Sequence, residues 1–138
     1  MSGLALQVLI LGSVGVAMEV VFTAVTDYPK NRSLRLLGYS YIWMLPIYGL
    51  APVFLGVMYP PLSPYHLAAR LAAYVAVLLV MEYLTGWILR KATGECPWER
   101  NYRGTPWAIH GLVRLDYAPA WAVACFIFES VYLAVRHI

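Results

Sequence analysis

The chain has 138 residues, of which 62% are hydrophobic and only 12% are charged. Its mean hydropathy of +0.66 lies far outside the range of a soluble domain, so the composition indicates a membrane protein. The net charge of +3 comes from basic residues near the ends of apolar segments, and no basic aromatic surface is available for nucleic acid. We therefore expect the lipid bilayer as a partner and no nucleic acid.

Four segments reach the length of about 20 apolar residues that a helix needs to cross a bilayer. In chain order they are residues 4–26, 39–59, 67–89 and 115–135. The first lacks the basic start and the cleavage site of a signal peptide, so we expect it to be retained. Little sequence remains for a soluble domain. The predicted fold is all-α, a polytopic four-transmembrane-helix bundle forming a single transmembrane domain over residues 1–138.

The basic residues divide unequally between the two sides of these spans. Only Arg70 and Arg136 lie on one side, whereas the other side carries Lys30, Arg32, Arg35, Arg90, Lys91, Arg100, Arg103 and Arg114. Cytoplasmic loops are enriched in Lys and Arg. The sequence therefore predicts that both basic loops are cytoplasmic and both termini outside, in a bacterial inner membrane.

The longest connection, GECPWERNYRGTPWAIHGLVR, joins the third and fourth spans. Thr105 and Pro106 are typical first residues of a helix, so they predict a short interfacial helix that Gly111 ends. His110 in this stretch is either a proton relay or an interfacial histidine bonded to backbone or water, and the second interpretation is favoured. The two cysteines of the chain have neither C-x-x-C spacing nor a nearby His partner, so no metal site is predicted.

Three acidic residues, Glu19, Glu82 and Glu129, fall inside predicted spans. Each would cost on the order of 3 kcal/mol or more if it faced lipid near the bilayer centre. We therefore expect all three to face protein or a wet cavity. Glu19 shares one helical face with small and polar residues, the kind of stripe by which membrane helices approach closely: Gly12, Gly15, Thr23 and Thr26.

Depth in the membrane separates the three acids. Glu19 and Glu82 each lie about four residues, or roughly 6 Å, to the cytoplasmic side of their span centres, so they are predicted to be level. Two such carboxyls raise each other's pKa, and one or both should be protonated, hydrogen-bonded to Thr23, Thr85 or Tyr48, or share a cation. These five residues form the candidate binding or proton site.

Glu129 lies toward the opposite surface, where Arg70 is long enough to reach it by snorkelling. A structural ion pair is therefore the favoured interpretation of Glu129. For Glu19 and Glu82 two interpretations stay open: hydrogen bonds that fix the register of packed helices, or a site for a proton, a cation or a polar substrate.

Five short motifs follow one another along nearly the whole chain. They are GVAMEVVFTA around Glu19, IWMLPIYG with Tyr48, MEYLTGWILRK around Glu82, CPWE with Cys96, Pro97 and Trp98, and HGLVRLDYAPAW beginning at His110. Together they resemble the transmembrane protein 229 family and the related bacterial ABC-transporter type IV (CmpB-like) family. The resemblance implies a compact membrane domain of unassigned biochemistry.

This chain departs from the family pattern in the loop between the third and fourth spans. An Asp-Tyr-Ser is typical there after the loop tryptophan, whereas this chain has Glu99, Arg100 and Asn101, and Ala108 replaces a small polar residue. The chain also has no G-x-x-x-x-G-K-[ST] motif, so an ATPase would have to be a separate partner.

Three functions compete on this evidence. The first is a small binding or accessory subunit that holds a lipid, quinone or pigment, forms a homo-oligomer, or docks to a larger membrane complex. The second is a permease or proton-coupled subunit in which Glu19 and Glu82 exchange protons while Pro46 and Pro52 break the second span. The third, a lipid-modifying enzyme, is the weakest because the sequence has no His cluster, nucleophile elbow or Cys-His constellation. No cofactor is identified by the sequence.

Overall fold

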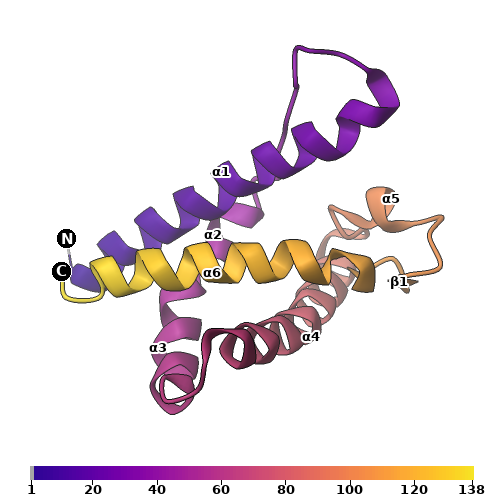
Figure 1. Ribbon diagram of the computed structural model, residues 1–138. Coiled ribbons are helices and arrows are strands. Elements are labelled where there is room, and N and C mark those ends of the chain that lie inside the picture. Colours follow the sequence, from indigo (N-terminus) through magenta and orange to yellow (C-terminus); the bar gives the residue numbers. More distant parts are fainter. Residues whose placement is uncertain (1) are drawn as a thin grey trace. The chain divides into compact units, whose positions relative to one another are not determined.

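The computed structural model describes residues 2–138. The regular secondary structure of these residues is helical apart from one short hairpin (Figure 1). The elements are α1 (Gly3–Asn31), α2 (Met44–Gly49), α3 (Ala51–Leu62), α4 (Leu67–Thr93), α5 (Glu99–Tyr102), β1 (Ala108–Ile109), β2 (Val113–Arg114), η1 (Leu115–Tyr117) and α6 (Ala118–Val135). Within this part of the chain, four stretches are long and apolar enough to cross a membrane: Gly3–Asn31, Met44–Leu62, Leu67–Thr93 and Leu115–Val135. The predicted all-α membrane fold is confirmed.

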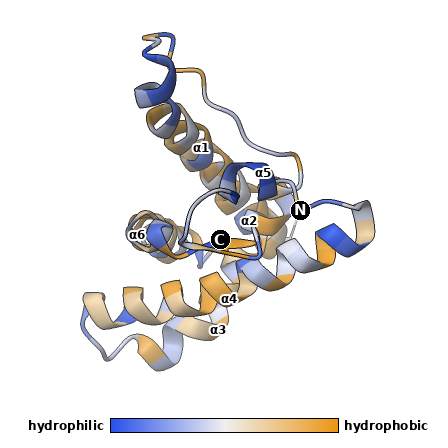
Figure 2. Ribbon diagram, turned by 90° about the vertical axis from the view of Figure 1, so that its right-hand side faces the viewer, coloured by the Kyte–Doolittle hydropathy of each residue, from blue (hydrophilic) through white to orange (hydrophobic). Residues whose placement is uncertain are grey.

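The chain forms two compact units. The first consists of Met1–Pro60 with Ile127–Ile138, and the second of Pro61–Phe126. Hydrophobic residues dominate the long helices, whereas hydrophilic residues gather at the C-terminal end of α1 and around α5 (Figure 2). This distribution fits helices whose middles contact lipid and whose ends contact water.

In the first unit, α1 and α2 pack closely because small residues of α1 face α2. Gly12 and Gly15 are buried in α1. A Cβ at Gly12 would lie 3.1 Å from the Leu45 carbonyl oxygen, and a Cβ at Gly15 would overlap the Tyr48 ring. α2 therefore packs against the small-residue face predicted for the first span.

After α1 the chain returns along the same helix as a non-helical segment, residues 33–43 (Figure 1). The Thr23 hydroxyl holds this segment, because it accepts from the Tyr39 amide at 2.9 Å and also lies 2.9 Å from the Tyr39 carbonyl oxygen. Gly38 crosses α1 so closely that a Cβ there would overlap the Val20 carbonyl. The second helical span consequently begins at Met44 rather than at residue 39.

The second span is interrupted between α2 and α3. Leu50 closes α2 by donating its amide to the Ile47 carbonyl at 3.1 Å, and α3 then begins at Ala51. Pro52 has no amide hydrogen to bond the carbonyl one turn before it, so the helical hydrogen-bond ladder cannot continue unbroken. Of the two prolines predicted to break this span, Pro52 follows the interruption, whereas Pro46 lies inside α2.

In the second unit, α4 is capped at both ends. His66 accepts from the Ala69 amide through Nδ1 at 3.3 Å, and Gly94 ends the helix in the left-handed conformation with φ of 90°. A left-handed glycine is a common helix terminator because it carries no Cβ. The loop that follows folds back on α4 at Gly86, where a Cβ would lie 3.0–3.2 Å from side-chain atoms of Leu112, Trp98 and Cys96.

A short helix is present in the loop after α4, but it does not lie where Thr105 and Pro106 predicted it. It is α5, at Glu99–Tyr102, and the stretch from residue 105 to Gly111 contains turns and the strand β1 instead. β1 pairs antiparallel with β2, with Ala108 opposite Arg114. His110 and Gly111 both have positive φ, at 53° and 69°, which forms the tight turn of a hairpin and is incompatible with a helix.

Candidate functional site

Glu19 is bound within the first unit by residues of two segments. The Ser40 hydroxyl in the returning segment donates to the Glu19 carboxylate at 2.9 Å, and Tyr48 of α2 also hydrogen-bonds it. Tyr48 can reach this position because Gly15, one turn before Glu19, leaves room for its ring. The other side of the Tyr48 ring lies 5.9 Å, between centroids, from Phe128. Glu19 thus joins α1, α2 and the segment between them.

Glu82 is bound within the second unit by two large donors. The Tyr102 hydroxyl in α5 donates to one carboxylate oxygen at 2.5 Å, and the Trp121 indole in α6 donates to the other at 3.3 Å. These bonds connect the middle of a membrane-spanning helix to the polar loop and to the start of the next span. Because both donors are neutral, they bind the carboxyl without bringing a positive charge to it.

The two threonines of the candidate site form hydrogen bonds with backbone atoms instead of with the carboxylates. Thr85 donates to the Met81 carbonyl at 2.7 Å, within its own helix. Thr23 bonds the Val20 carbonyl at 3.1 Å in addition to Tyr39. Of the three hydroxyl partners expected for the acids, Tyr48 is the one found on a carboxylate, at Glu19. The pairing of Glu19 with Glu82, which belong to different units, stays a prediction.

Glu129 is buried, with 3% of its surface exposed, in the part of α6 that belongs to the first unit. Arg70 belongs to the second unit, where its guanidinium donates to the Tyr65 carbonyl at 2.8 Å. The ion pair between Arg70 and Glu129 stays a prediction.

Tyr102 connects Glu82 with the hairpin through a chain of contacts. Its ring lies edge-on to that of Tyr117 at 5.6 Å between centroids. Arg114 of β2 stacks over Tyr117 at 4.0 Å, bonds its hydroxyl at 2.9 Å and forms a two-pronged pair with Asp116. The position of Glu82 is therefore tied to the packing of the loop after α4.

The loop motif with Cys96, Pro97 and Trp98 forms the packed interior of that loop. Trp98 is 5% exposed and donates its indole hydrogen to the Leu112 carbonyl at 2.9 Å. Cys96 is 2% exposed, and its burial raises the pKa of the thiol to about 11. These residues have a structural position against Gly86. The side chain of His110 bonds the Tyr83 hydroxyl at 2.8 Å.

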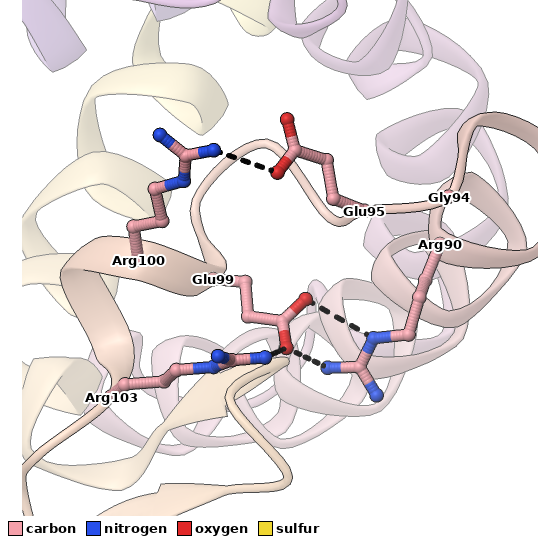
Figure 3. A pocket seen from close by; sticks show the side chains of 6 residues that line it. All are labelled: Arg90, Gly94, Glu95, Glu99, Arg100 and Arg103. Carbon is pink, nitrogen blue, oxygen red and sulfur yellow. Dashed lines mark hydrogen bonds and ion pairs between the residues drawn. The ribbon is translucent and has the colours of Figure 1, made fainter.

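Glu99 is the centre of a charged cluster at the C-terminal end of α4 (Figure 3). Its carboxylate accepts from Arg90 at 2.9 and 3.2 Å, from Arg103 in a short ion pair, and from the Cys96 amide at 3.4 Å. The hydrogen bond from Arg103, assisted by Arg90, holds the pKa of the Glu99 carboxyl below its ordinary value of 4.5. The side chain therefore stays ionised at neutral pH although it is buried.

Beside this cluster lies a pocket of about 470 Å³. It is lined by Arg90, Gly94, Glu95, Glu99, Arg100 and Arg103. Figure 3 draws the Arg100–Glu95 pair on one side of it and the Arg103–Glu99–Arg90 cluster on the other. Arg100 and Glu95 are 3.2 Å apart and largely exposed, so this second pair is held far less firmly.

Residues 7–137 match the protein family described as "Putative ABC-transporter type IV". The match covers nearly the whole chain and includes the three intramembrane glutamates and the loop cluster. The chain belongs to this family. No solved structure matches it.

Membership in the ABC-transporter type IV family agrees with the resemblance drawn from the five motifs. The family name associates the chain with transporters, and its four apolar helices make it a multi-pass membrane protein whose helices contact lipid. In the part of the chain that the structure describes, no group of three His, Cys, Asp or Glu residues is arranged to hold a metal ion.

The structure of this family member brings together several partners that its sequence pattern does not predict. Ser40 binds Glu19, and Tyr102 and Trp121 bind Glu82, from distant parts of the sequence. No local sequence pattern predicts such contacts. Glu99 and Arg103, by contrast, have the four-residue spacing of a helical ion pair, a signal that the sequence did contain.

Proposed function

We propose that this protein is a small integral membrane binding or accessory subunit whose intramembrane carboxylates order its helices for docking to a larger membrane complex. The observation that carries the proposal is the bonding of Glu82 by Tyr102 and Trp121, which joins two spans to the loop after α4. Such bonds favour a fixed scaffold over a site that opens and closes. ATP hydrolysis would belong to a partner chain, because this chain lacks a nucleotide-binding motif.

We also propose a location and an orientation for the protein in the membrane. The protein would lie in a bacterial inner membrane, with both basic loops in the cytoplasm and both termini outside. The loop after α4, which Glu82 helps to order, would then face the cytoplasm. A partner ATPase would meet the subunit on this side. The assembly could contain one or several copies of the chain.

Tyr102→Phe tests whether the Glu82 contact supports docking. This change removes the hydroxyl that donates to Glu82 and keeps the ring that packs against Tyr117. We expect the unfolding free energy to fall by about 1.5–3 kcal/mol, the usual value for a bond to a charged group. In native gels of solubilised membranes, we also expect less of the chain in its high-mass assembly.

Tyr83→Phe is the matched control, since it removes a tyrosine hydroxyl next to Glu82 in α4 that bonds His110 and not Glu82. The share of the Tyr83→Phe variant in the high-mass assembly should equal that of the unchanged protein. A chain that migrates alone before any substitution, or equal losses in both variants, would contradict the docking role.

A second function, proton-coupled transport through Glu19 and Glu82, is favoured by one observation. The second span is broken at Leu50, next to Tyr48, which bonds Glu19. Broken helices beside intramembrane acids occur in transporters.

Liposomes that contain the purified chain and a pH-sensitive dye separate the two functions. A potassium gradient with valinomycin drives proton uptake if the chain conducts protons. For an accessory subunit we expect uptake no greater than in protein-free liposomes. Uptake that is present and then disappears in the combined Glu19→Gln and Glu82→Gln variant would establish transport instead.

A further inference from the structure

The pocket at the C-terminal end of α4 contains more positive than negative side chains. Its walls carry three guanidinium groups, of Arg90, Arg100 and Arg103, and two carboxylates, of Glu95 and Glu99 (Figure 3). We propose that this pocket binds a phosphate-bearing anion at the membrane surface. Its volume of about 470 Å³ is within the range of small-ligand sites.

Glu99 positions one wall of the pocket. Its carboxylate is buried and accepts bonds from both Arg90 and Arg103, so the two guanidinium groups are held in fixed places. Each guanidinium has five N–H donors. Arg103 uses one terminal nitrogen for Glu99, and its remaining nitrogens are available to a ligand. Its side chain is 71% exposed, so an anion from outside can reach it.

Arg100 supplies the opposite wall. It pairs with Glu95 at 3.2 Å, with 84% of the Arg100 side chain and 64% of the Glu95 side chain exposed. Exposed ion pairs of this kind contribute little free energy. A phosphate carries more charge and more acceptor oxygens than a carboxylate, and the planar guanidinium matches its geometry in a two-pronged bond. Phosphate can therefore replace Glu95 as the partner of Arg100.

The pocket lies at the depth where phosphates occur in a membrane. α4 has 27 residues and is therefore about 40 Å long, about 10 Å more than the hydrocarbon core of a bilayer. Arg90 and Lys91 are in its last turn. This end extends into the headgroup layer, where either an anionic phospholipid or a water-soluble phosphate supplies the required group.

The test uses the full chain in nanodiscs made of equal parts phosphatidylcholine and phosphatidylglycerol. Native mass spectrometry measures how much phosphatidylglycerol stays bound, and titration with inorganic phosphate in phosphatidylcholine nanodiscs measures the soluble anion. We expect Arg100→Gln to weaken binding about tenfold, because it removes a charged donor pair. Glu95→Gln should strengthen binding about threefold, because it removes the competing carboxylate.

Lys91→Gln is the matched control. It removes one positive charge from the last turn of α4, near the pocket, but Lys91 lies over the Trp87 ring, at 5.9 Å from its centroid, and does not line the pocket. Arg100 contacts only the exposed Glu95 among the described ion pairs, so Arg100→Gln should fold normally, as an unchanged melting temperature would verify.

Each outcome decides the proposal. Retained phosphatidylglycerol that is lost in Arg100→Gln supports a lipid headgroup, whereas saturable binding of inorganic phosphate with the same dependence on Arg100 supports a soluble phosphate compound. If Arg100→Gln and Lys91→Gln weaken anion binding equally, the binding reflects general attraction between positive side chains and anions. That result would overturn the proposed site. Binding of neither probe by the unchanged protein would overturn it as well.

Discussion

At the scale of single residues, two buried side chains of the same loop have pKa shifts in opposite directions. Cys96 is buried among apolar groups, and this raises the pKa of its thiol. Glu99 is buried beside two arginines, and their hydrogen bonds lower the pKa of its carboxyl. The two residues are three positions apart, so neighbouring partners, and not depth alone, decide which charge state the fold stabilises.

Cys96 should react slowly with thiol reagents. Its pKa of about 11, against an ordinary value of 9.0, implies about 100-fold less thiolate at neutral pH. In a Cys125→Ala background, we expect maleimide labelling of the folded chain at least that much slower than labelling in denaturant. Trp98→Ala should accelerate it by exposing the thiol. Equal rates for folded and denatured protein would contradict the buried position.

At the scale of helices, contact between α1 and α2 depends on the absence of side chains. Gly15 lies against the Tyr48 ring, and Gly12 lies against the α2 backbone near Leu45. Close approach of this kind lets Tyr48 bond Glu19. The same two glycines that weaken a helix by intrinsic propensity are therefore what allows the packing.

Gly15→Ala should destabilise the protein by about 1–3 kcal/mol, because the added methyl group overlaps the Tyr48 ring and forces it away. Gly56→Ala in α3 is the control, since its Cβ would meet only the Tyr132 hydroxyl, at an ordinary 3.5 Å. The control should be neutral or more stable by up to about 1 kcal/mol, from helix propensity. Unfolding in mixed micelles measures both, and equal effects would rule out the proposed contact.

At the scale of the whole molecule, the arrangement of charge predicts the orientation in the membrane. Both connections rich in Lys and Arg should be cytoplasmic, whereas the connection between α3 and α4 and both termini should be outside. This orientation would place the arginine pocket and the loop held by Tyr102 on the cytoplasmic side.

Single cysteines in a background without Cys96 and Cys125 test this orientation. Asn31→Cys and Ala92→Cys should be protected from a membrane-impermeant maleimide in intact cells, and Ser63→Cys and His137→Cys should be labelled. All four positions are exposed in the structure, so burial does not explain protection. Labelling of Ala92→Cys in intact cells would reverse the predicted topology.

The sequence by itself determined the membrane class, the four apolar helices, the break in the second span and the close-packing glycines of α1. These features follow from length, hydropathy and local spacing, which act over a few turns of chain. The family was also recognisable from short motifs, and the match over residues 7–137 agrees.

Only the tertiary structure decided what binds the carboxylates. Glu19 takes Ser40 from 21 residues away, and Glu82 takes Trp121 from 39 residues away. Polar groups inside a folded protein need hydrogen-bond partners, and the nearest donors in space come from distant parts of the chain. Helical periodicity in the sequence does not predict which donors these are. The hairpin at His110 and Gly111 replaced the expected helix for a similar reason. Positive φ at both positions and packing of Leu112 on Gly86 outweighed the local signal of Thr105 and Pro106.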